Sequence, residues 1–202
     1  ESGSLRALRR ETDFVLPAQF PNLNRDRHAY LRTATEFSSG EIEVNALLID
    51  VCDVSAKAGG SVVKLHSGVL LLAGGPENKN SLLGGGTYPL TFDFCGRTGY
   101  LSLCSDRDYS AHKEGSKTVS REAIVQAKLT NFGDKPLVLS GLAGNVLRLA
   151  NNDNNFTRLT IQGLSLSGVS NRDKLFRVNI SDERQLGSSK GAITLADATL
   201  SF

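Results

Sequence analysis

The stretch SVVKLHSGVLLLA, residues 61–73, decides the fold class of this chain. Val63 and Leu65 alternate with polar residues, and Val69 and Leu71 continue the same period of two. Successive side chains of a β-strand point to opposite faces, so this period is typical of a strand with one face in a core. The stretch therefore predicts a long β-strand.

Similar alternation recurs along most of the 202 residues and predicts about ten strands. Asn131-Phe132-Gly133-Asp134 is a strong turn signal between two such segments and predicts a hairpin. No helical segment is long enough for parallel crossovers, and no repeat of fixed period is visible. We therefore expect an all-β chain, folded as a single antiparallel β-sandwich. The expected strands cover 41–54, 61–73, 88–94, 100–104, 119–129, 136–142, 146–149, 156–166, 175–180 and 192–202.

The first residues differ in character from the rest. Pro17 and Pro21 exclude a long helix there, so residues 1–27 are predicted to form an extended N-terminal arm and residues 28–202 the β-domain. One short helix is expected over 27–37, where Tyr30, Leu31 and Ala34 have helical spacing. A solvated surface would also account for the charges in the arm, but contact with a polyanion is the sharper hypothesis. Its candidate RNA-contacting residues are Arg6, Arg9 and Arg10.

The residues that carry most enzyme chemistry are sparse. His28, His66 and His112 are scattered, and none belongs to a recognisable catalytic motif. Cys95 and Cys104 flank a Gly-Arg-Thr-Gly turn and could pair if the chain were secreted, whereas a reducing compartment would leave all three cysteines, Cys52 included, as thiols. The Asn/Asp-rich run 151–155 is interpreted as a solvated loop in preference to a calcium site. We therefore expect no enzyme activity, no metal and no cofactor.

One segment carries a family resemblance. AYLRTATEFSSGEIEVNALL, residues 29–48, resembles the small coat protein of comovirus-type (secovirid) plant viruses and, more widely, the picorna-like capsid jelly roll. TYPLTFDFCGRTGYLSL (87–103) and the segment 122–152 follow in a compatible order. The resemblance implies a jelly roll whose loops contact neighbouring subunits. It also implies release from a polyprotein, which suits a chain that begins at Glu1 and contains no Met.

Two functions from different classes remain open. The first is a structural coat protein of a small icosahedral positive-strand RNA virus, found in the virion and the cytoplasm of the infected host cell. Its partners would be a large coat protein, copies of itself and, weakly, genomic RNA, with no membrane. The second is a secreted or cell-surface β-sandwich adhesion module. Two N-glycosylation sequons, at Asn155 and Asn179, support the second function if the chain enters the secretory pathway.

Overall fold

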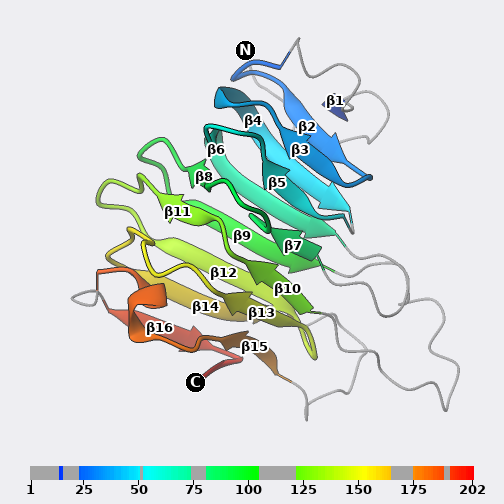
Figure 1. Cartoon of the computed structure of the whole chain (residues 1–202). Coiled ribbons are helices and arrows are strands. Elements are labelled where there is room, and N and C mark those ends of the chain that lie inside the picture. Colours follow the sequence, from blue (N-terminus) through cyan, green and yellow to red (C-terminus); the bar gives the residue numbers. More distant parts are fainter. Residues whose placement is uncertain are drawn as a thin grey trace, which may run out of the picture.

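A computed structural model describes residues 14–15, 23–50, 52–73, 81–104, 122–164, 175–188 and 192–202. These residues form two β-sheets, and in each sheet the strands lie side by side from one end of the molecule to the other (Figure 1). The ten-stranded sheet contains β1 (Phe14–Val15), β2 (His28–Leu31), β4 (Gly40–Asp50), β6 (Ser61–Ala73), β8 (Leu90–Asp93), β9 (Gly99–Cys104), β11 (Lys128–Thr130), β12 (Leu137–Leu142), β14 (Leu159–Leu164) and β16 (Ile193–Ala196). The seven-stranded sheet contains β3 (Thr35–Phe37), β5 (Val54–Ala56), β7 (Ser81–Leu83), β10 (Glu122–Val125), β13 (Val146–Leu149), β15 (Phe176–Asn179) and β17 (Ala198–Ser201).

All the strand pairs described in both sheets run parallel. The chain crosses from the ten-stranded to the seven-stranded sheet and returns one strand further along, so that β12, β13, β14 and β15 follow one another in sequence but alternate between sheets. This is the arrangement of a parallel β-solenoid. Each circuit of the chain through the two sheets, called a coil below, contacts the coil before it and the coil after it. The expectation of an antiparallel jelly-roll sandwich was wrong.

The ten-stranded sheet bends into two parts. One part contains β8, β11 and the first half of β6, and the other contains the second half of β6, β9 and β12, so these coils have three sides. The first half of β6 pairs with β8 and its second half pairs with β9. Gly68 lies between the halves with φ of +73°, and a Cβ there would overlap the carbonyl oxygen of Thr98. Only glycine tolerates both conditions, so Gly68 is where the strand can turn. In the preceding strand, the register shifts between Val44 and Ala46.

Further expectations fail as well. The ranges 119–129 and 192–202, each expected as one strand, each include parts of two strands that belong to different sheets. The segment 27–37, predicted to be helical, forms β2 and β3, because tertiary pairing with β4 and β5 overrides its local spacing. The Asn131–Asp134 turn does not close a hairpin: β11 pairs with β8, while β12 pairs with β9 and β14. It forms instead a corner of one coil. The predicted arm falls largely outside the described residues, but β1 within it pairs in parallel with β2.

The core lies between the sheets and is mainly aliphatic. Aromatic rings line up at one corner of three successive coils, after β8, after β11 and before β14. Phe94 stacks on Phe132 with ring centroids 4.6 Å apart, and Phe132 meets Phe156 edge-on at 6.0 Å. All three side chains are at most 2% exposed. We call these three residues the aromatic column.

Candidate functional site

The last coil of the solenoid, made of β16 and β17, has no further coil packed against it in the described structure. Ile193 and Leu195 stand in register with Leu159 and Ile161 of the preceding coil. Leu159 and Ile161 are 2% and 0% exposed, whereas Ile193 and Leu195 are 45% and 51% exposed. The register therefore places core-type residues of the last coil at an uncovered end. We call this surface, formed by Ile193, Leu195 and the exposed Phe202, the open end.

The backbone at the open end is also unpaired. β16 pairs with β14 and β17 pairs with β15, so each strand has one free edge among the described residues. Such an edge presents a row of N–H and C=O groups to any strand that approaches. Natural edge strands are often protected by charges or proline, but neither β16 (ITLA) nor β17 (ATLS) contains one. The open end is thus competent for strand pairing.

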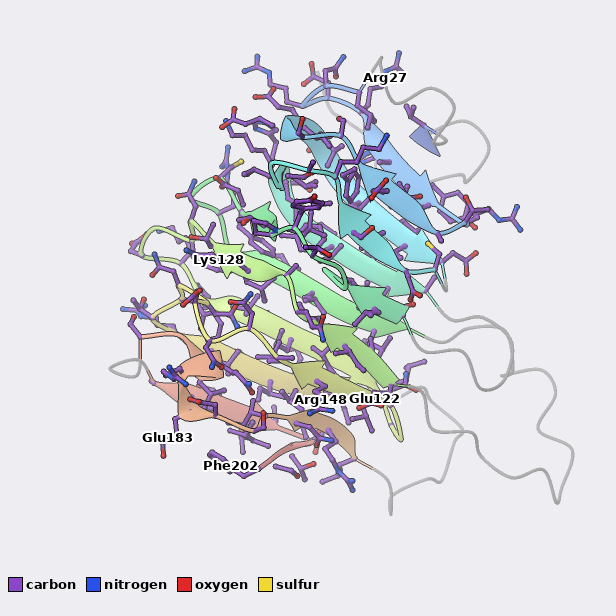
Figure 2. All side chains as sticks on the ribbon, viewed as in Figure 1. Arg27, Glu122, Lys128, Arg148, Glu183 and Phe202 are labelled. Atoms are coloured by element: carbon purple, nitrogen blue, oxygen red, sulfur yellow. The ribbon has the colours of Figure 1, made fainter. Side chains whose placement is uncertain are left out.

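The opposite end of the solenoid is different. Ala29, Leu31 and Phe37 of the first coil are at most 2% exposed. β1 adds to the edge of β2, and exposed arginines such as Arg27 stand near this end (Figure 2). Figure 2 shows Phe202 and Glu183 at the other extremity, beside the last coil. The core is therefore covered at one end and uncovered at the other.

A row of charged residues runs across the outer face of β4, β6 and β8. Glu43, Lys64 and Asp93 are in register across the three strands. Lys64 donates to Glu41 at 2.6 Å, and this hydrogen bond is the main reason that the pKa of Lys64 is raised. His66 Nε2 lies 3.7 Å from the Glu43 carboxylate. Charges of opposite sign thus lie beside one another on this face.

Asp93 in this row accepts hydrogen bonds from two successive coils at one corner of the solenoid. Its Oδ1 accepts hydrogen bonds from the backbone N–H of Cys95 and from Asn131 Nδ2, both at 2.7 Å. The two donors lie in successive coils, so the carboxylate joins them. Burial and the neighbouring Asp93 charge raise the pKa of the Cys95 thiol. A raised pKa keeps the thiol protonated and makes it a poor nucleophile.

A second polar group lies at the end of β4. Tyr30 donates a 2.5 Å hydrogen bond to Asp50, and both side chains are buried. Cys52 follows, and burial together with the charges of Asp50 and Asp53 raises its pKa to about 11. This thiol is therefore protonated at neutral pH, which suits a packed side chain and not a catalytic one.

The predicted site residues are only partly placed. Arg6, Arg9 and Arg10, as well as His112, lie outside the described residues. The structure does not bring Cys95 and Cys104 together: Cys95 is a free thiol in the turn before β9, and Cys104 is the last residue of that strand. The backbone of Cys104 is in register with Ala73 at the end of β6, whereas Asp93, two residues before Cys95, is in register with Lys64 near its start, and this separation exceeds the span of a disulfide.

The Asn/Asp-rich run contains a structural residue that sequence reasoning missed. Asn154 is buried, its Oδ1 accepts from the Leu129 N–H, and its Nδ2 donates to the Gln185 carbonyl, each at 2.9 Å. It links three coils and is not part of a solvated loop tip. Within the described ranges, no three His, Cys, Asp or Glu side chains are grouped to hold a metal ion. The only sequence signal for the role of Asn154 is the recurrence of asparagine at the turns.

No family model, curated protein or solved structure matches this chain. Among the described residues there is no helix with the length and apolar character needed to cross a membrane. The likeness to plant virus coat proteins therefore stays a hypothesis from the sequence, and the jelly roll on which it depended is replaced by a solenoid.

Proposed function

We propose that this chain is a structural and binding module that joins protein subunits through the open end of its solenoid. The observation that carries the proposal is the exposure of Ile193 and Leu195, at positions that are buried in the coil before. A solenoid coil cannot bury its apolar face alone and needs a neighbour or a cap. Packing against other subunits was expected from the coat-protein hypothesis, and here it is proposed for a solenoid in place of the jelly roll.

The partner we propose for the open end is a second copy of the chain. The first coil is already covered, so copies cannot stack head to tail into a fibre through exposed core. Two open ends can instead meet about a two-fold axis, with the edge strands of one copy antiparallel to those of the other. Because β16 and β17 contain no charged residue, this pairing sets no like charges opposite each other.

The driving force can be approximated from the exposure values. Full burial of a Leu or Ile side chain contributes about 1.5–3 kcal/mol, so covering two half-exposed side chains contributes about 1.5–3 kcal/mol per copy. Association also costs translational and rotational freedom, so side-chain burial alone gives only a weak dimer. Strand-to-strand hydrogen bonds and the 81% exposed Phe202 add to the contact.

The test is the mass of the purified chain in solution, measured by light scattering from about 1 μM to about 1 mM, the range in which weak dimers dissociate. We expect a monomer–dimer equilibrium that the double variant I193K/L195K shifts to monomer. The matched control is T194K, which places one lysine between them on the outward face of β16. Circular dichroism of each variant checks that the sheets are retained.

Two results would contradict the proposal. One is a wild-type chain that stays monomeric across the whole range. The other is a folded I193K/L195K variant that dimerises as well as the T194K control, because the contact would then lie elsewhere.

A further inference from the structure

Two sequons occur in the chain, and the structure presents them differently. A sequon is Asn-x-Ser/Thr, in which an oligosaccharide is transferred to the asparagine side chain when the chain enters the secretory pathway. The two are Asn155-Phe156-Thr157 and Asn179-Ile180-Ser181. A glycan is bulky and hydrated, so the folded chain must leave the modified asparagine at its surface.

Asn155 satisfies this condition. Its neighbours Asn154 and Phe156 are buried, while Asn155 and Thr157 are exposed. Phe156 belongs to the aromatic column, and Asn154 bonds to Leu129 and Gln185. These two anchors fix Asn155 in an outward position. Its backbone N–H donates to the Leu129 carbonyl at 2.9 Å, so the contact of Asn155 with the neighbouring coil is made by its backbone.

Asn179 does not satisfy it. This residue ends β15, and it stands between Arg148 of β13 and Ser201 of β17 in the sheet. Its Oδ1 is buried and has no hydrogen-bond partner in the described part of the chain. The hydroxyl of Ser181, the third residue of the sequon, accepts a 3.2 Å hydrogen bond from Gln185. Asn179 is only partly exposed, so a glycan there would have to draw this amide away from the neighbouring strands and break the Gln185 contact of its sequon serine.

We infer that Asn155 is the sequon at which this chain accepts an N-linked glycan when it enters the secretory pathway, and that Asn179 is not. In the transfer, Asn155 Nδ2 bonds to C1 of a lipid-linked oligosaccharide. The C1–O bond to the lipid pyrophosphate breaks, and the amide loses a proton to the transferase. No oxidant or reductant is needed. Asn155 lies just before β14 and is not one of the residues that form the open end. This inference therefore does not depend on dimerisation.

The test is site occupancy in the full chain secreted from a eukaryotic cell. A sequon in the secretion tag reports that the transferase has acted on each molecule. Glycopeptide mass spectrometry should find Asn155 modified in most molecules and Asn179 unmodified. N155Q should lose the glycan on the chain itself, T157S should retain it, and N179Q should leave the gel mobility unchanged.

The inference is overturned if Asn155 is unmodified while the tag sequon is occupied. It is equally overturned if folded, secreted protein carries a glycan at Asn179. Occupancy and dimer mass are separate readouts, so failure of one proposal is distinguishable from failure of the other.

Discussion

Replacing Phe132 with alanine tests whether the aromatic column supports the solenoid. Phe132 is 2% exposed and contacts a ring in the coil before it and another in the coil after it. Truncating a buried Phe to Ala costs about 3–5 kcal/mol, because transfer free energy is lost and a cavity remains. For a chain of this size, this corresponds to a melting temperature lower by about 6–20 °C. Calorimetry and urea unfolding of F132A measure the change.

The matched control is F202A, which removes the same side chain from an 81% exposed position. Its free energy of unfolding should change by less than about 0.5 kcal/mol in the monomer. A double-mutant cycle between F132A and F94A should show coupling of about 0.5–1.5 kcal/mol, as expected for stacked rings. If F132A costs no more than F202A, the stacking of coils through this column is refuted.

Three further predictions concern single positions. G68A should destabilise the fold more than G40A, since both glycines have positive φ but only Gly68 would also place a Cβ against a backbone carbonyl; equal free energies of unfolding would contradict this. Arg184 lowers the pKa of Asp182 to about 2, below its unfolded value of about 3.9, so its stabilising effect is present above about pH 4 and lost as the pH falls toward about 2. Unfolding curves of wild type and D182N should therefore differ near neutral pH and converge at about pH 2; a difference that persists there would refute the assignment. Cys52, with a pKa of about 11, should react with iodoacetamide in the folded chain far more slowly than in urea; equal rates would contradict its burial.

The sequence predicts many of the strands but neither their number nor their direction, since ranges expected as one strand, such as 192–202, include two strands of different sheets. The alternation in 61–73 identifies β6, and the segments 100–104, 136–142 and 146–149 coincide with β9, β12 and β13. Alternation is the same in parallel and antiparallel strands, so it contains no information on pairing. The coils escape detection as repeats because Leu101, Leu139, Ile161 and Leu195, which share a register, are unevenly spaced in the chain.

The candidate site was less predictable still. Ile193 and Leu195 are ordinary strand residues in the sequence, and only their place in the last coil exposes them. Asn154 lies in a run that resembles a polar loop, yet its amide joins separate coils. Both roles depend on which coil is adjacent, a tertiary property that local patterns do not contain.

The side-by-side stacking of successive coils is the central claim, and one disulfide tests it most directly. Ser102 and Ser140 lie opposite each other on β9 and β12, with hydroxyl oxygens 2.5 Å apart. With the native cysteines replaced by serine, S102C/S140C should form a disulfide on mild oxidation, while S102C/Q162C, which skips one strand, should not. Failure of the first pair to cross-link in folded protein, or equal cross-linking of both pairs, would contradict the stacking of β12 between β9 and β14 in the solenoid.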